Sequence, residues 1–418
     1  MKRHTLTLLL LAIFMSCSTE SQVDENLATD PSDQSGTEDS APSESESDYY
    51  TSPRSYAVIY NLQSDYGVDS SFATDDSAAL QQAIDDAAAA GGGKIVIPEG
   101  NYSLAGILLK SDIHIEISSS ATIRPTELSA NSNKNYAIFT AKSEAAEPLE
   151  NISIGSYGGD KFTFDLRYLS DGFENVRCIL FSNVYNFEIS DILIEDNETV
   201  FAAIDFTGEN IDNVIYGPTK GVVKDLENYN SEYGYGLIQV QFGRDMLFKN
   251  LYSLGGATLR LESHLTTYYQ TDCIEYIARI VGREITCENG HAAVMLSPHF
   301  VENSWVDVRG MEGIACESTL LIEGGFVSDD EAALGLTPGH FTAESTFREI
   351  KSTFSATDAQ VHPKHYQYMV DELYDLLPST SPWEAKSGPS IAVIMHTADY
   401  SADYTTDDIE SAEGFLDS

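Results

Sequence analysis

Short segments that alternate polar and apolar residues fill the middle of the chain, from residue 107 to residue 322. Asn, Gly, Asp and Ser residues separate one segment from the next. This period of two predicts β-strands with one face in a core and the other in solvent. Three stretches, 256–261, 291–296 and 314–321, look like variants of one coil. Loose repetition of this kind predicts a β-solenoid of stacked rungs, and a sandwich of short strands is the alternative.

A helix is predicted ahead of these strands. Thr74–Asp75–Asp76–Ser77 offers an N-cap, and Gly91–Gly92–Gly93 ends the pattern. Between them apolar residues recur at helical spacing, at Ala79, Leu80, Ala83, Ile84 and Ala87. Such a helix would cap the open end of the core and protect its edge strands. We therefore expect an all-β solenoid, spanning 53–328, with an N-terminal capping helix.

The pattern of apolar and polar residues changes after residue 328. Residues 329–388 contain helical periodicity, strongest at 364–377, and a strand pattern returns at 390–395. This predicts a small helical insertion at 329–388 that could lie over a cleft as a lid. Residues 389–418 would then form a final solenoid strand and an acidic tail.

The N-terminal region predicts export. Residues 1–17 combine a basic start with a short apolar run that ends at Cys17, typical of a lipoprotein signal peptide. Cys17 would be lipidated and would supply the sole membrane contact, and plain secretion is the alternative. Residues 18–52 are acidic and rich in Ser, which predicts a disordered linker.

The net charge of −43 makes nucleic acid and anionic membranes poor default partners. An anionic substrate would need a local basic cleft. We expect a monomer.

The cysteine positions do not determine whether disulfides form. Cys178, Cys273, Cys287 and Cys316 follow Cys17 and allow three full disulfide pairings. As an alternative, Cys287 and Cys316 stack as thiols in successive strands. No CxxC motif or His-rich cluster indicates a metal site.

The stretch 236–264 carries the candidate chemistry. Along 257–264 the apolar residues would point inward, while Arg260, Glu262 and His264 would stand in one outward row. Gln239 and Gln241 alternate in the same way on the preceding strand. This row could hold an anion and move a proton, and an ordinary solvated strand face is the alternative.

Two stretches resemble known families. The segment TDDSAALQQAIDDAAAAGGGKIVIPEGNY resembles the first segment of right-handed parallel β-helix polysaccharidases. The stretch 236–264 is similar to the iota-carrageenases, glycoside hydrolase family 82, in which Arg, Glu and Asp alternate along one strand. The resemblance implies that Glu262 is the general acid, that Arg260 binds sulfate and that Gln239 positions the hydrolytic water. It assigns the following family histidine to His299, and we add Gln241 and Arg309 as candidate substrate-binding residues.

The chain departs from the family at the catalytic base, because His264 stands where the family carries Asp. Outward residues two apart on a strand are separated by about 7 Å, and inverting glycosidases need roughly 6.5–9.5 Å between acid and base. A neutral imidazole at position 264 could therefore act as the base. Alternatively His264 binds sulfate and Glu317 or Asp245 supplies the base, or the substitution abolishes activity.

The resemblance implies an endo-acting, inverting hydrolase of β-1,4 linkages in a sulfated red-algal galactan, with iota-carrageenan as the expected substrate. The alternatives are a non-catalytic β-helix lipoprotein that binds anionic glycans and a pectin-type lyase or hydrolase. No cofactor is expected, and the family implies calcium, sodium or chloride as possible structural ions.

Overall fold

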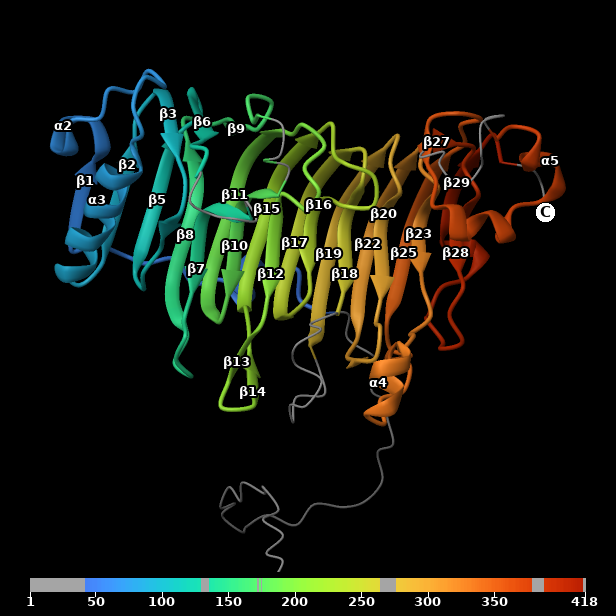
Figure 1. Cartoon of the computed structure of the whole chain (residues 1–418). Helices are drawn as coiled ribbons and strands as arrows, with labels where there is room; N and C mark the ends of the chain where they lie inside the picture. The colour runs from blue at the N-terminus through green and yellow to red at the C-terminus, as the bar shows by residue number, and fades with distance from the viewer. Residues whose placement is uncertain are drawn as a thin grey trace, which may run out of the picture. The chain divides into compact units, whose positions relative to one another are not determined.

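The structure is a computed structural model that describes residues 42–128, 135–170, 173, 175–263, 276–377 and 387–415. Within them, two large sheets of parallel strands run side by side (Figure 1). The larger sheet has 14 described strands and the smaller has nine. Because the chain alternates between the two sheets and every successive pair is parallel, the strands stack as rungs of a β-helix and not as a sandwich.

The main ladder of the larger sheet consists, in spatial order, of β1 (Val58–Asn61), β2 (Gly93–Ile97), β5 (Ile113–Ser118), β8 (Leu149–Tyr157), β11 (Val184–Glu195), β15 (Thr219–Tyr229), β17 (Gly243–Leu254), β19 (Ile277–Glu288), β22 (Val306–Ile314), β25 (Thr346–Thr353) and β29 (Ile409–Glu413). A side branch of the same sheet contains β3 (Gly100–Leu104), β6 (Ala121–Pro125) and β9 (Phe162–Asp165).

The smaller sheet consists, in spatial order, of β4 (Ile107–Leu108), β7 (Tyr136–Lys142), β10 (Val176–Ser182), β12 (Ile204–Thr207), β16 (Gly236–Val240), β18 (Ala257–Glu262), β20 (Ala292–Ser297), β23 (Ser318–Ile322) and β28 (Ala392–His396). Three short pairs lie outside both sheets: β13 (Glu209–Ile211) with β14 (Val214–Tyr216), β21 (Glu302–Asn303) with β24 (His340–Phe341), and β26 (Ala359–Gln360) with β27 (Ser387–Gly388).

The long strands of the larger sheet turn a corner at stacked left-handed residues. Asp225, Asn250 and Glu284 occupy equivalent positions on β15, β17 and β19, and their φ angles are 57°, 52° and 55°. Asp and Asn adopt this region more readily than most residues. Each rung can therefore change direction without leaving the ladder.

Apolar side chains from both sheets fill one continuous core. Leu259 and Leu261 of β18 are fully buried in it, as their alternation predicts. Aromatic rings extend the packing along the stack: the ring of Phe206 lies 5.7 Å from Phe187 and 6.0 Å from Phe248. The inward face of β18 is thereby fixed, and its other face carries the polar row.

The predicted capping helix is confirmed as α3 (Ser77–Ala89), which lies next to α2 (Leu62–Tyr66) at the β1 end of the stack (Figure 1). Its apolar positions Leu80, Ala83, Ile84 and Ala87 are buried in the main core. Its N-cap is Asp76, whose carboxylate accepts a hydrogen bond from the backbone of Ser103 and caps no helix N–H.

The end of the predicted disordered linker is ordered, which corrects the 18–52 prediction for its last residues. Residues Glu46–Tyr49 form α1, and Tyr49 and Tyr50 pack against Val222 and Leu247 on the outer face of the larger sheet. Lys224 and Lys249 pair with Glu46, and Arg283 pairs with Glu44 at 2.7 Å. The composition predicted disorder because ordering this segment costs conformational entropy. The burial of two aromatic rings and the pairing with basic side chains on the sheet offset that cost.

The segment 329–388 is less helical than predicted. It contains the short helices α4 (Asp329–Ala333), η1 (Pro363–Tyr368) and α5 (Asp371–Tyr374), so the periodicity at 364–377 yields two short helical turns. It also contains β25, a full rung of the larger sheet. The tail likewise adds η3 (Thr406–Asp408) and β29, which pairs with β25. The β-helix thus continues through the boundaries that the sequence predicted.

Three cysteines are buried free thiols: Cys178, Cys287 and Cys316. The Sγ atom of Cys316 lies 3.1 Å from the carbonyl oxygen of Cys287, so these two stack as thiols and form no disulfide. Cys273 and Cys17 lie outside the described residues. In the described part of the chain, no helix is both long enough and apolar enough to cross a bilayer.

Candidate active site

The polar row lies on β18 and its two neighbours in the smaller sheet. A left-handed Gly256, with φ of 63°, makes the tight turn into β18, where a Cβ would lie 2.2 Å from the carbonyl oxygen of Tyr235. In the parallel ladder, Gln239 of β16 is the register partner of Arg260, and Ser297 of β20 is the partner of Glu262. The turn and the ladder together fix which polar side chains meet.

The carboxylate of Glu262 is the centre of this cluster. Its Oε2 atom accepts a hydrogen bond from Nε2 of Gln239 at 2.8 Å and lies 2.7 Å from Nη2 of Arg260. Its Oε1 atom lies 3.1 Å from Nε2 of His299. Two neighbouring strands of the sheet, β16 and β18, together with the turn after β20, thus converge on one carboxylate.

Two of the partners of Glu262, Arg260 and His299, are themselves held in place. Arg260 also donates to the carbonyl oxygen of Gly234, and its guanidinium lies 5.2 Å from the ring centroid of Tyr235. His299 follows β20 with a left-handed φ of 49°, and its ring lies 4.3 Å from that of Phe326. Because both side chains are largely buried, the cluster is preorganised.

The electrostatics of the cluster favour an ionised Glu262. Burial alone would raise the pKa of its carboxyl, but the charge of Arg260 and the bond from His299 outweigh burial and lower the pKa to about 2. Reciprocally, burial opposes the charge of Arg260, and Glu262 raises the pKa of that guanidinium. Glu262 and Arg260 therefore form an ion pair. The carboxylate of Glu262 takes up a proton near neutral pH only if the charge of Arg260 is compensated by another group.

The structure brings Gln239, Arg260, Glu262 and His299 together, but not every predicted site residue. Gln241 lies just after β16, half-buried, and its backbone N–H donates to Phe206 at 2.8 Å. His264 lies outside the described residues.

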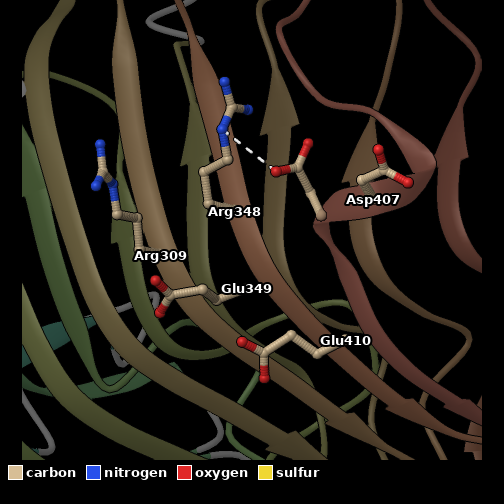
Figure 2. Close-up of a pocket in the computed structure, with 6 residues that line it drawn as sticks. Arg309, Arg348, Glu349, Asp407 and Glu410 are labelled. Atoms are coloured by element: carbon tan, nitrogen blue, oxygen red, sulfur yellow. Dashed lines mark ion pairs between the residues drawn. The ribbon is translucent and has the colours of Figure 1, made fainter.

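Arg309 lies on β22 of the larger sheet and lines a different cavity, of about 300 Å³, together with Arg348, Glu349 and Asp407 (Figure 2). It pairs with Asp307 at 3.5 Å. The sequence could not exclude Arg309, because strand periodicity does not say to which sheet a strand belongs.

The two alternative bases also lie elsewhere. Glu317 is fully buried between two histidines, and Asp245 is the third residue of β17 in the larger sheet, where it pairs with Arg279 at 2.6 Å. Neither carboxylate is placed on the face that carries Glu262.

Glu323 was missed by the sequence reasoning. It follows β23, and its backbone N–H donates to Leu296 of the strand next to β18. It lines a cavity of about 130 Å³ with Phe326, Lys364 and Tyr368. A signal existed: Thr319–Leu–Leu–Ile–Glu323 repeats the pattern of Thr258–Leu–Arg–Leu–Glu262. The repeat places a second carboxylate two strands along the same outward column.

Comparisons with known proteins agree with this fold. No family model matches the chain. An iota-carrageenase of Alteromonas macleodii is 33% identical over 68% of this chain and 56% of its own length. An iota-carrageenase of Zobellia galactanivorans is 36% identical over 67% of this chain and 56% of its own length. The chain thus matches little more than half the length of these curated relatives.

The structural comparison covers more of the fold. A crystal structure of an iota-carrageenase of family GH82 from A. fortis, in the absence of chloride ions, aligns with a TM-score of 0.78. That alignment spans 91% of this chain and 95% of the other, at 25% identity. The chain is therefore a protein of the right-handed parallel β-helix class. Within that class it belongs to the iota-carrageenase family, GH82.

Proposed function

We propose that this chain is an endo-acting, inverting glycoside hydrolase that cleaves β-1,4 linkages in a sulfated galactan, with iota-carrageenan as its substrate. The observation that carries the proposal is the convergence of Gln239, Arg260 and His299 on the carboxylate of Glu262. A carboxyl group held at both oxygens, with a guanidinium beside it, suits proton delivery next to a sulfated sugar.

Glu262 acts as the general acid in this proposal. In the ligand-free protein it is ionised, because Arg260 holds its pKa to about 2. A sulfate group that binds Arg260 compensates the charge of the guanidinium. Burial then raises the pKa of Glu262, which takes up a proton and gives it to the oxygen of the leaving sugar.

The second half of the reaction needs a water and a base. Gln239 is nearly buried beside Glu262, and we assign its carboxamide to holding the attacking water. We assign the base to His264, two residues after Glu262 in the sequence. Residues two apart on an extended strand are separated by about 7 Å, and a separation of that size admits one water between an acid and a base, which favours inversion. His299 orients Glu262 and lines the same face.

The chain's strongly negative net charge makes local cations decisive for a polyanionic substrate. Arg260 supplies the cation nearest to the proposed reacting bond. We assign sulfate recognition to it, because its planar fork matches pairs of sulfate oxygens. We keep Gln241, which lies just after β16 and outside the Glu262 cluster, as a proposed substrate contact.

We further propose that the chain is exported and held at the cell surface through a lipid on Cys17. The support is the basic, then apolar, N-terminal sequence that ends at this cysteine. We propose that the enzyme acts as a monomer and needs no cofactor for hydrolysis, while calcium, sodium or chloride would serve only as structural ions.

The test is reducing-end release from iota-, kappa- and lambda-carrageenan and from polygalacturonate. We expect release from iota-carrageenan alone, with a rapid fall in viscosity as an endo mode requires, and inverted product anomers in a proton NMR time course. Binding of iota-carrageenan without release would favour the non-catalytic glycan-binding alternative. Unsaturated products absorbing in the ultraviolet would instead indicate a lyase.

A further inference from the structure

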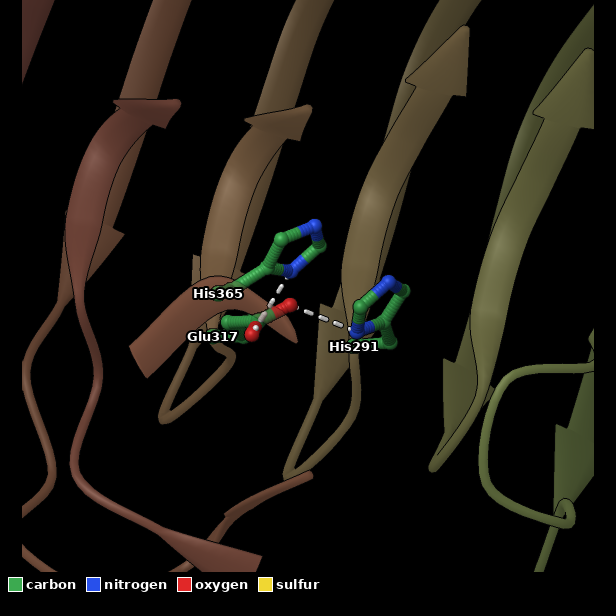
Figure 3. Close-up of side chains that lie close together, drawn as sticks. All are labelled: His291, Glu317 and His365. Atoms are coloured by element: carbon green, nitrogen blue, oxygen red, sulfur yellow. Dashed lines mark hydrogen bonds and ion pairs between the residues drawn. The ribbon is translucent and has the colours of Figure 1, made fainter. Parts of the chain in front are cut away.

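Two buried histidines and a buried glutamate meet next to the proposed active-site face, at the beginnings of two neighbouring rungs. His291 immediately precedes β20, Glu317 immediately precedes β23, and His365 comes from η1 (Figure 3). One donor atom from each lies within 4.8 Å of the others. The exposed fractions of the three residues are 2%, 0% and 2%. Residues 74 positions apart in the sequence thus form one compact set of nitrogen and oxygen donors.

The hydrogen bonds of this set satisfy one carboxylate oxygen of Glu317 and not the other. Nδ1 of His365 lies 3.0 Å from Oε1 of Glu317, and the backbone N–H of His362 donates to the same oxygen at 3.0 Å. Oε2 of Glu317 lies 2.7 Å from Nδ1 of His291 but has no hydrogen-bond partner in the described structure. A fully buried carboxylate oxygen without a hydrogen bond is costly unless a cation lies against it.

The second imidazole nitrogen of His365 is also engaged. Its Nε2 atom lies 3.2 Å from Oε1 of Glu323, and Lys364 forms an ion pair with the same carboxylate. A carboxylate on the far nitrogen of a histidine is the usual support of a metal-binding imidazole, because it fixes the tautomer and the ring orientation. The Nδ1 atoms of His291 and His365 lie 2.7 Å and 3.0 Å from the two oxygens of the same Glu317 carboxylate, so one ion could contact all three side chains.

We propose that Nδ1 of His291, a carboxylate oxygen of Glu317 and Nδ1 of His365 bind one divalent transition-metal ion. Two imidazoles and one carboxylate suit Zn²⁺, Co²⁺, Ni²⁺ or Cu²⁺, whereas Ca²⁺ and Mg²⁺ prefer oxygen ligands alone. Zinc bonds to such donors are about 2.0–2.2 Å long, so the three side chains would contract slightly around the ion. The carbonyl oxygen of Gln360 lies 3.4 Å from Nδ1 of His291, so a backbone oxygen is also close to the proposed ligands.

The ion would be structural. It would tie the beginnings of β20 and β23 to η1, and therefore hold Lys364 and Tyr368 in the wall of the cavity that Glu323 lines. The proposal does not rest on the hydrolase activity, because it concerns only the geometry of buried donors. A protein with no activity on any carrageenan would still bind the ion.

The experiment uses the full mature chain without a histidine tag. After dialysis against a chelator and then buffer, Zn²⁺ is titrated by calorimetry, and the thermal midpoint is measured with and without Zn²⁺. We expect one Zn²⁺ per chain and a rise of several degrees, since an ion at a thousand times its Kd stabilises a fold by about 4 kcal/mol. His291→Gln, Glu317→Gln and His365→Gln should each lose the stoichiometric binding and the shift. His114→Gln, which alters a histidine that is equally buried and lies 2.9 Å from Ser153, should keep both.

Replacement by Co²⁺ keeps the test decisive if a variant fails to fold. Wild-type protein with one Co²⁺ should show the visible absorption of a low-symmetry site with nitrogen and oxygen ligands, and Zn²⁺ should displace it. No binding of Zn²⁺ or Co²⁺ by folded wild-type protein would overturn the proposal. Stoichiometric binding that survives in folded His365→Gln protein would overturn it as well, because the ion would then lie elsewhere.

Discussion

Arg260 and Glu262 lie two residues apart on one strand, and Nη2 of the arginine is 2.7 Å from Oε2 of the glutamate. Both side chains are about 15% exposed, so solvent screens the pair weakly. The arginine that would recognise a sulfate is therefore the same group that keeps the proposed general acid ionised. Substrate binding and protonation of Glu262 are coupled through this contact.

Replacement of Glu262 by Gln tests the proposed acid. The amide keeps the shape of the side chain but cannot deliver a proton, so we expect kcat on iota-carrageenan to fall by about 10²–10⁴-fold. Circular dichroism should show an unchanged fold. Glu288→Gln is the matched control, because Glu288 ends β19 and accepts a bond from Tyr252 at 2.7 Å on the other sheet. A Glu262→Gln enzyme with wild-type kcat would remove Glu262 from the mechanism.

The same pair predicts a pH dependence of stability. The pKa of Glu262 is about 2 in the folded chain against 4.5 for an ordinary glutamate. Its stabilising effect is therefore complete above pH 4.5 and disappears as the pH falls toward 2. Since one pKa unit corresponds to about 1.4 kcal/mol, the wild type should lose about 2 kcal/mol more than Glu262→Gln between pH 6 and pH 3.

Urea unfolding at both pH values measures this difference, and the other carboxylates cancel because both proteins carry them. An equal loss in the two proteins would mean that Glu262 is not held by Arg260 and His299 in solution.

Much of the fold could be predicted from the sequence, because local signals agreed. The alternation at 257–262 predicted β18, and the spacing of Leu80, Ala83 and Ile84 predicted α3. The site prediction placed Glu262 beside Arg260 on one strand. It also named Gln239 and His299, whose contacts with Glu262 depend on strand register.

The failures share a physical cause, which is long-range packing. Arg309 looked like a basic neighbour, yet its strand belongs to the other sheet. Composition predicted disorder for 46–50, but Tyr49 and Tyr50 gain a surface to cover only once β15 and β17 are paired. No sequence pattern joins His291, Glu317 and His365, and only the stacking of rungs brings them together.

Arg260→Lys tests sulfate recognition. Lysine keeps the charge but loses the planar fork, so we expect KM for iota-carrageenan to rise about tenfold with a smaller change in kcat. Arg309→Lys should leave KM unchanged, because that side chain lies on the larger sheet and pairs with Asp307. The opposite pattern, with KM sensitive to Arg309 alone, would move the substrate to the cavity in Figure 2.

Tyr50→Ala tests whether the segment after the linker belongs to the folded domain. The ring of Tyr50 is 8% exposed, and its removal should cost about 3 kcal/mol of unfolding free energy, measured in urea. Tyr157→Ala is the control: that ring is 36% exposed on β8, and its loss should cost less than about 1 kcal/mol. Equal stabilities of wild type and Tyr50→Ala would mean that α1 does not dock in solution.

His264 is the residue on which inversion depends in the proposed mechanism, and its pKa gives a direct test. A base works only when it is deprotonated, so kcat/KM should rise with pH and level off above the pKa of the base. With histidine as the base, the midpoint of this rise should lie near pH 6.5, and in His264→Asp the midpoint should move to about pH 4. We call this rise the acidic limb of the pH profile. The aspartate variant should remain active, because a carboxylate at this position can also accept the proton of the attacking water.

His264→Ala tests the proposed base by removing its side chain. We expect kcat to fall by about 10²–10⁴-fold, with substrate binding retained, and the limb near pH 6.5 to disappear. Azide or formate added as an external base should restore part of the rate, because the missing side chain leaves room for a small anion beside the water. If the alanine variant keeps both the wild-type rate and its acidic limb, the base is another group. The search would then turn to Glu323, the carboxylate that lies two strands from Glu262 along the same outward column.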